Sequence, residues 1–270
     1  MTVNSDALDL APRPPVPLTG TNTKTVTAPQ DFPGWLAGLR AQADVLAPAG
    51  FFALVPTLML SMTRDALRET GIAYGSQDCA AEPEGITGET PASHLTEFGC
   101  TYVMIGHHQR RRSLGENDRT AARKATRGAE AGLTPVLCAG ETERLTPTDA
   151  ASTVTAQVRP VLEQLPAAAP LVVLYEPLWA SREQQAADAE HITVVQRMLT
   201  ALTTGRPGPV RTLYGGAVAP GTWKTVRQGT RLDGLALGKA GIDATARRTV
   251  IEEILADPPV QGEAEHARLS

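Results

Sequence analysis

The sequence predicts an α/β protein, a single (β/α)8 barrel with eight parallel strands. Short apolar runs alternate with longer amphipathic stretches, and eight such runs can be counted. Most of them begin 20 to 40 residues apart, which leaves room for a crossover helix between neighbours. Continuous apolar strands that alternate with helices indicate a parallel sheet covered by helices, and eight repeats favour a closed barrel. The length of 270 residues suits one such barrel, although it would also suit two small domains.

The strands are expected in the eight apolar runs, taken in chain order. These runs are PLTGTNTK from Pro17, FFALVP from Phe51, IAYGSQ from Ile72, YVMIGH from Tyr102, TPVLCAGE from Thr134, LVVLYEP from Leu171, RTLYGG from Arg211 and GLALGK from Gly234. Between them, DRTAARKATRGAEAGL is typical of a crossover helix with Asp118 as its N-cap. A doubly wound open sheet is the competing fold. It normally has a glycine-rich phosphate loop after its first strand, and GTNTKT is not such a loop.

Composition and charge narrow the function. The formal net charge of -4 does not suggest a nucleic-acid surface, and there is no apolar run of the ~18 residues that a membrane span needs. Cys79, Cys100 and Cys138 are an odd number without metal-ligand spacing, so reduced thiols in a cytoplasmic protein are expected. The N-terminus lacks the pattern of a secretory signal. Residues 1–15 are predicted to be a disordered extension, 16–256 the barrel and 257–270 a flexible tail.

Polar residues follow the ends of most predicted strands. In barrels of this kind chemistry takes place at the carboxyl ends of the strands, so these residues are the candidates for a site. A cation, an imidazole and a carboxylate from three different strands would meet at one mouth. In strand order the candidates are Asn22 and Lys24, Gln77, His107, Glu141, Glu176, Gly215 and Gly216, and finally Gly238 and Lys239.

Several motifs resemble those of triose-phosphate isomerases. YVMIGHHQRRRSLGEND is similar to that family's GHSERR followed by a glycine–glutamate pair, and LYEPLWA is similar to its YEPVWA. LCAGE, LYGGAVAPG and GTNTK resemble CIGE, YGGSV and GNWK, and GSQDC…GITGE resembles AQNC…GAFTGE, shortened by about one residue. The matches lie in order along residues 20–242. Together they indicate homology over nearly the whole barrel, and the resemblance implies a TIM barrel.

The resemblance also implies catalytic roles. Glu176 matches the base that moves a proton between the two carbons of an enediol, and His107 matches the neutral imidazole that polarises the carbonyl. Lys24 matches the lysine that stabilises developing negative charge, and Asn22 the asparagine beside it. Two residues apart in a strand, Asn22 and Lys24 should point to the same face. His108 stands where the family has serine and is expected to be a bystander.

The arginines after His107 are interpreted as structural. In the family the corresponding pair binds neighbouring carboxylates and supports the dimer, so Arg110 and Arg111 are expected to pair with Glu116 and Glu141. The resemblance implies a homodimer through residues 79–89, a loop that would dock beside the active site of the other subunit.

The sequence departs from the family mainly around the phosphate. The expected substrate-binding set is Gly215, Gly216, Ala217, Gly238, Lys239 and Arg182. Ala217 replaces a serine, Lys239 replaces the second glycine of a pair, and the lid AIGTGKTA has become ASREQQAA. Gln109 replaces a glutamate next to His107. The proton-transfer residues are kept while the phosphate contacts change, which suggests selection for a related reaction on a different anion.

The leading hypothesis is an aldose–ketose isomerase of a small phosphorylated sugar that uses neither a metal nor an organic cofactor. The substrate could be a triose phosphate or a four-carbon tetrulose phosphate. Two alternatives stay open: another enzyme that abstracts a proton next to a carbonyl in a specialised pathway, and a catalytically silent binding protein. No nucleic-acid or membrane partner is expected.

Overall fold

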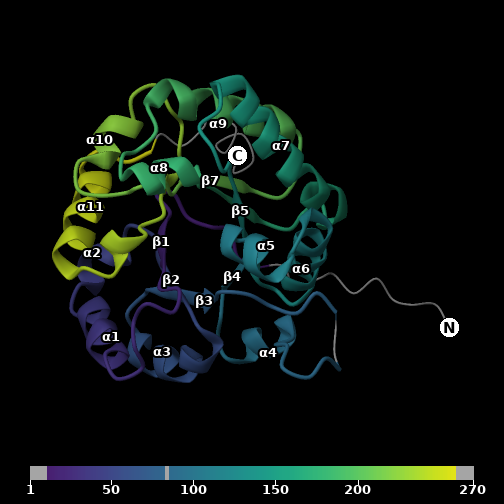
Figure 1. The fold of residues 1–270 in the computed structure, drawn as a ribbon. Coiled ribbons are helices and arrows are strands. Elements are labelled where there is room, and N and C mark those ends of the chain that lie inside the picture. Colours follow the sequence, from purple (N-terminus) through teal and green to yellow (C-terminus); the bar gives the residue numbers. More distant parts are fainter. Residues whose placement is uncertain (1–10, 83–84, 260–270) are drawn as a thin grey trace, which may run out of the picture.

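The computed structural model describes residues 11–82 and 85–259 and consists of one barrel surrounded by helices (Figure 1). Eight parallel strands pair in chain order. The barrel closes where Gly20 bridges to Ala236 and the Leu237 N–H donates to the Gly20 carbonyl over 2.7 Å. The predicted fold class is therefore confirmed. The strands are β1 (Thr19–Asn22), β2 (Phe51–Val55), β3 (Ala73–Ser76), β4 (Tyr102–Ile105), β5 (Thr134–Ala139), β6 (Leu171–Tyr175), β7 (Val210–Tyr214) and β8 (Gly234–Leu235).

The strands are short and mostly apolar because both of their faces are buried. Every residue of β2, β4, β5 and β6 is buried. Inside the barrel the rings of Phe52 and Tyr102 stack with their centroids 4.5 Å apart. Gly20 makes room for them, since a Cβ on Gly20 would lie 2.5 Å from the Phe52 ring. A larger apolar layer fills the space between the barrel and the helices.

The helices surround the barrel, and the short helices α5 and α8 lie over the carboxyl ends of the strands (Figure 1). Within the described residues no helix is both long and apolar enough to cross a membrane. The α-helices are α1 (Phe32–Arg40), α2 (Ala43–Leu46), α3 (Leu60–Leu67), α4 (Ala92–Glu97), α5 (His108–Leu114), α6 (Asp118–Glu130), α7 (Pro147–Gln164), α8 (Leu178–Glu183), α9 (Ala189–Thr203), α10 (Thr222–Val226) and α11 (Ala244–Ala256), and two 3-10 turns are η1 (Thr57–Met59) and η2 (Lys239–Gly241).

Two sequence predictions about local structure need comment. The predicted helix after β4 is α6, but its N-cap is Asn117, whose side chain accepts the Thr120 N–H over 3.0 Å. The prediction of Asp118 as the cap was wrong by one residue, because Asp118 is the first helical residue and pairs with Arg111. The predicted tails fall largely on residues 1–10 and 260–270, which lie outside the described residues. Pro14 belongs to the predicted N-terminal extension but lies within the described residues. It is buried, and its carbonyl accepts a hydrogen bond from Arg211.

Candidate active site

A hollow at the carboxyl ends of the strands brings together most of the predicted site residues. Its empty volume, including space open to solvent, is about 440 Å³. Among the residues that line it are Asn22, Lys24, His107, Glu176, Gly215 and Gly238. The other four predicted substrate-binding residues, Gly216, Ala217, Lys239 and Arg182, are not part of this wall.

Lys24 reaches the hollow from a turn and not from a strand. β1 ends at Asn22, and Lys24 has a left-handed backbone with a φ of 51°. The Asn22 Oδ1 accepts the Lys24 N–H over 2.7 Å, and the Gln77 side chain donates to the Lys24 carbonyl over 2.8 Å. The argument that strand alternation aligns Asn22 with Lys24 was therefore wrong, although both line the hollow. The side chains of Asn22 and Gln77 stabilise a backbone conformation that is costly for a residue other than glycine.

His107 is the N-cap of α5, and this position sets its protonation. Its Nδ1 accepts the Gln109 N–H over 3.2 Å, so the proton of the neutral ring is assigned to Nε2. Burial, assisted by the nearby cations Lys24 and Arg110, lowers the pKa of His107 to about 4. At neutral pH the ring is therefore uncharged and presents an N–H towards Glu176, whose Oε2 lies 3.9 Å from Nε2.

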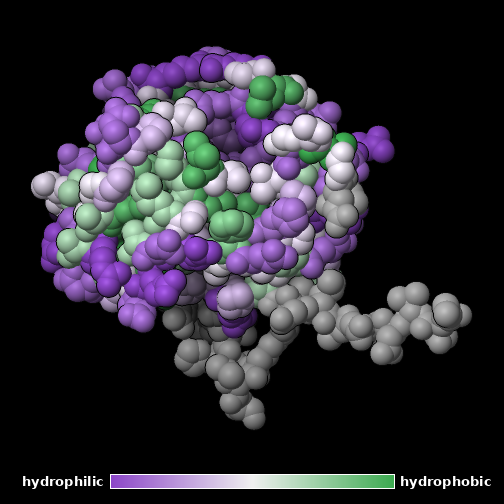
Figure 2. Space-filling view, turned by 90° about the horizontal axis from the view of Figure 1, so that it is seen from below, coloured by the Kyte–Doolittle hydropathy of each residue, from purple (hydrophilic) through white to green (hydrophobic). Residues whose placement is uncertain are grey.

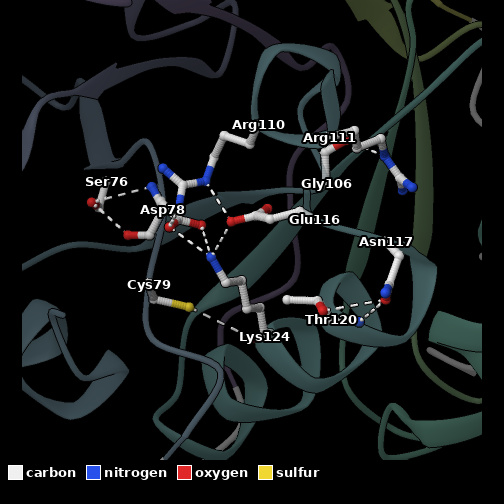
Figure 3. A network of polar contacts seen from close by, with 10 residues as sticks. All are labelled: Ser76, Asp78, Cys79, Gly106, Arg110, Arg111, Glu116, Asn117, Thr120 and Lys124. Carbon is white, nitrogen blue, oxygen red and sulfur yellow. Dashed lines mark hydrogen bonds and ion pairs between the residues drawn. The ribbon is translucent and has the colours of Figure 1, made fainter. Parts of the chain in front are cut away.

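A ring of ion pairs holds α5 in place (Figure 3). Arg110 on α5 binds Asp78 and Glu116, each over 2.7 Å. Lys124 on α6 binds the same two carboxylates over 2.7 and 2.6 Å, and its side chain is buried. Two cations and two anions thus alternate between the end of β3 and the helix that His107 caps. The predicted pair of Arg110 with Glu116 is confirmed.

The predicted pairing of an arginine with Glu141 was wrong. Arg111 donates instead to the Gly106 carbonyl and binds Asp118. Glu141 is buried beside aromatic side chains and accepts hydrogen bonds from Tyr175 and Trp179. Sequence motifs give no information about this choice, because it depends on which side chains the barrel places behind β5.

Glu176 directly follows β6, and its carboxylate faces two imidazoles. Its Oε2 lies 3.9 Å from the His107 Nε2 and 3.6 Å from the His108 Nδ1. Burial alone would raise the pKa of Glu176, but His108, His107 and Lys24 outweigh burial and hold it below its ordinary value. The base is therefore ionised at neutral pH. His108 was expected to be a bystander, and the sequence contained no signal that its ring would face Glu176.

The same three residues raise the question of a metal ion. One ligand atom from each of His107, His108 and Glu176 can be chosen so that all lie within 4.8 Å of one another. However, the hydrogen bond from Gln109 to the His107 Nδ1 leaves the proton on Nε2, the atom that faces the other two groups. That nitrogen offers no lone pair to an ion. The group is better suited to proton transfer than to metal binding.

The segment after Glu176 is a short helix tied to the loop that follows β5. Arg182 on α8 binds Glu143 over 2.8 Å, and Arg144 binds Glu183 over 2.6 Å. Arg182 does not line the hollow, and its contact with substrate stays a prediction. Gln184 ends the helix in a left-handed conformation with a φ of 55°. The Tyr214 hydroxyl then accepts the Ala187 N–H over 2.8 Å.

Two glycines, Gly215 and Gly238, also line the hollow, and they present backbone instead of side chains to it. Gly215 follows β7, and its N–H donates to the Tyr175 carbonyl over 2.9 Å. Gly238 precedes η2 and borders the hollow, whereas the Lys239 side chain next to it is exposed. Ala217 has a φ of 49°, an unusual value for a residue with a Cβ.

Comparisons with known proteins agree with this arrangement. Residues 17–254 match the family model described as triosephosphate isomerase. The chain is 38% identical to the triosephosphate isomerase of Cupriavidus taiwanensis over 77% of this chain and 87% of the relative. It is 34% identical to that of Thermus thermophilus, over 82% of this chain and 92% of the relative. The chain therefore belongs to the triosephosphate isomerase family and is an isomerase of the intramolecular oxidoreductase class.

Proposed function

We propose that the chain interconverts the aldose and ketose forms of a triose phosphate through an enediol, with Glu176, His107 and Lys24 as the reacting groups. The observation that carries the proposal is that these three side chains, from three different strand ends, line one hollow. The names of the relatives support the triose as the substrate.

Glu176 is the base in this mechanism. Because its pKa is held below the ordinary value, its carboxylate is ready to take a proton from the carbon next to the carbonyl. It then returns the proton to the neighbouring carbon. The backbone of Glu176 lies where the chain turns from β6 into α8, so the ends of these two elements fix the point from which its side chain starts.

His107 and Lys24 act on the oxygens. The Nε2–H of the neutral His107 donates a hydrogen bond to the carbonyl oxygen and relays a proton between the two oxygens of the enediol. The N–H of a neutral imidazole is much less acidic than that of an imidazolium, so after it has given its proton to one enediolate oxygen the ring can take a proton back from the other. Lys24 supplies the positive charge that stabilises the developing enediolate.

The phosphate lies between Gly215 and Gly238 in this proposal. Neither residue has a Cβ, so the backbone can approach the anion closely. Arg182 is assigned no role because it is paired with Glu143. Lys239 is close in sequence to this wall and is retained as a candidate contact.

We also keep the proposals of a homodimer and of a cytoplasmic location. Exposed apolar side chains follow each of the first four strands: Val26, Leu58, Ile86 and Leu114. Figure 2 shows the side of the molecule on which α3 and α4 lie, where hydrophobic residues gather between polar borders. Such a surface fits a second copy of the chain, and the loop 79–89 is the segment that we expect to dock onto that copy. Residues 83 and 84 of that loop lie outside the described residues.

The decisive test is proton exchange in heavy water. The protein is incubated with the ketose form of a triose phosphate, and with a tetrulose phosphate in parallel, and NMR follows both deuterium at the carbon next to the carbonyl and the formation of aldose. We expect exchange and isomerisation of the triose phosphate, and loss of both in Glu176→Gln. Glu163→Gln, at an exposed position of α7, is the matched control. Exchange that persists in Glu176→Gln would remove this residue from the mechanism.

A further inference from the structure

A buried cation lies behind the turn that borders the proposed phosphate position. Arg247 on α11 is 1% exposed, and its Nη1 donates to the carbonyl of Gly241, the last residue of η2, over 3.0 Å. The same turn begins directly after Gly238, which lines the substrate hollow. The guanidinium and the hollow are therefore connected by one short turn.

The charge of Arg247 has no counterion close to it. Within the described residues no acidic side chain forms an ion pair with Arg247, whose Nε donates to the uncharged amide of Gln42 over 2.9 Å. Its Nη2 is buried and has no hydrogen-bond partner in this part of the chain. Burial lowers the pKa of Arg247 to about 10, so the group keeps its charge at neutral pH, and the exposed Asp243 acts on it only from a distance. A buried charge without a counterion is costly.

Two hydrogen bonds connect this charge to the start of the turn. Arg247 polarises the Gly241 carbonyl, whose peptide group includes the Ile242 N–H. This N–H donates to the Lys239 carbonyl over 3.0 Å. The peptide group of that carbonyl includes the Ala240 N–H, one of the first donors of η2, which have no acceptor within the turn. Hydrogen bonds in such a chain polarise one another, so the charge of Arg247 strengthens the donors at the start of η2.

Other residues fix the position of η2. The Trp35 indole on α1 also donates to the Gly241 carbonyl, over 3.3 Å. The Thr21 hydroxyl on β1 donates to the Leu237 carbonyl over 2.6 Å, just before the turn. A Cβ on Gly241 would collide with the Thr21 Oγ1, so the turn lies directly against β1. Because these contacts hold the turn from two other elements, what Arg247 adds is mainly its charge.

We propose that Arg247 is a positioning residue that acts through the backbone of η2, and that its buried charge tunes the hollow for a substrate with a doubly charged phosphate. The phosphate then serves as the counterion that the guanidinium otherwise lacks. This inference rests on the proposed function, in which the phosphate lies beside Gly238. It assigns the preference for an anion to a residue that does not touch the substrate.

The first experiment uses Gln42→Glu, which changes the charge beside Arg247 and leaves the guanidinium in place. The new carboxylate has nearly the shape of the amide and lies next to the Arg247 Nε, so it supplies a counterion. Inorganic phosphate is titrated into the protein, and the backbone amide signals give its dissociation constant by NMR. We expect phosphate to bind roughly three- to tenfold more weakly to Gln42→Glu than to the wild type. Urea-induced unfolding should show no loss of stability.

The control for net charge is Gln164→Glu, at an exposed position of α7, which should leave the dissociation constant unchanged. If Arg247 only supported the fold, Gln42→Glu would hold it at least as well as the wild type does. Unchanged or tighter binding of phosphate to the folded Gln42→Glu would therefore overturn the inference, whether or not the chain isomerises triose phosphate.

The second experiment compares two substrates. Values of kcat and KM are measured for triose phosphate and for the same triose without its phosphate, in the wild type, Arg247→Met and Arg247→Lys. Arg247→Met should lower kcat/KM for triose phosphate about tenfold and change that for the free triose much less, because the charge acts on the phosphate. Arg247→Lys keeps the charge and should recover most of the loss. Equal losses on both substrates would refute the inference while the proposed function stands.

Discussion

The indole of Trp179 donates a hydrogen bond to the Glu141 Oε1 over 2.8 Å, which ties the first turn of α8 to the loop after β5. The same oxygen accepts the Tyr175 hydroxyl over 2.9 Å and lies 3.2 Å from the His191 Nε2. Burial alone would raise the pKa of Glu141, but these donors hold it below the ordinary value. One buried carboxylate thus fixes the segment that follows the proposed catalytic base.

The first prediction concerns this bond. Trp179→Phe keeps an aromatic ring but removes the donor, so it should lower the free energy of unfolding by about 1.5–3 kcal/mol, the range for a hydrogen bond to a charged group. Urea-induced unfolding at pH 7 measures the change. The matched variant is Trp223→Phe, in which the lost partner is the neutral Asp257 carbonyl at 2.9 Å. Its cost should be smaller, at roughly 1 kcal/mol. Equal costs would contradict a charged acceptor at Trp179.

The second prediction is a dependence of stability on pH. The unfolded His107 takes up a proton below pH 6.5, whereas the folded one does so only near pH 4. The unfolded state therefore binds more protons between these values, and stability should fall as the pH drops. The shift corresponds to about 3 kcal/mol in total, of which about 2 kcal/mol is lost between pH 7 and 5.

The comparison with His107→Gln isolates this contribution. The free energy of unfolding is measured at pH 7 and at pH 5 for both proteins, and the variant should lose about 2 kcal/mol less than the wild type between the two. Glu116 and Glu141 also have lowered pKa values, but their contribution is lost only as the pH falls below 4.5, and they are present in both proteins. Parallel losses in the two proteins would contradict a buried, neutral His107.

The order of the elements, and the presence of His107 and Glu176 at one hollow, could be predicted from the sequence, because both follow local patterns. His107 and Glu176 each follow an apolar strand and lie within a recognisable motif. The contacts that the sequence did not reveal are those between side chains from different elements. Arg182 meets Glu143, and His108 meets Glu176, only because the barrel places neighbouring strand ends side by side. Lys24 shows a further limit, since its turn depends on the amide of Gln77, which comes from another strand.

The third prediction concerns the end of α8. Gln184 has a φ of 55°, a conformation that glycine adopts without steric cost. Gln184→Gly should therefore raise the free energy of unfolding by up to about 1 kcal/mol. Gln185 is not among the residues with a positive φ, so Gln185→Gly should lower stability by a similar amount. Thermal unfolding of the two variants gives the comparison. Destabilisation by both would show that the strain at Gln184 is negligible.

The fourth prediction tests the proposed dimer. Leu58 lies on η1 and is 84% exposed. It is one of the four exposed apolar residues that follow the first four strands. A buried interface at this face would not tolerate an unpaired charge, so Leu58→Asp should convert the dimer into a monomer at micromolar concentration. Sedimentation velocity measures the species. Met198→Asp carries the same change to an exposed apolar position on α9 and should leave the dimer intact. A wild-type chain that sediments as a monomer would refute the proposal.

The last prediction concerns Lys239, which stands where the family has a glycine. If it replaces lost phosphate contacts, it acts as a charged donor, and Lys239→Gly should weaken substrate binding roughly ten- to a hundredfold. If it blocks the phosphate instead, the same change should raise kcat/KM for triose phosphate. We expect weaker binding, because Ala217 lacks a hydroxyl and Arg182 is paired with Glu143. Lys224→Ala on α10 removes another lysine and controls for net charge. Since the two outcomes have opposite signs, one kinetic comparison decides between them, and an unchanged kcat/KM would exclude Lys239 from the site.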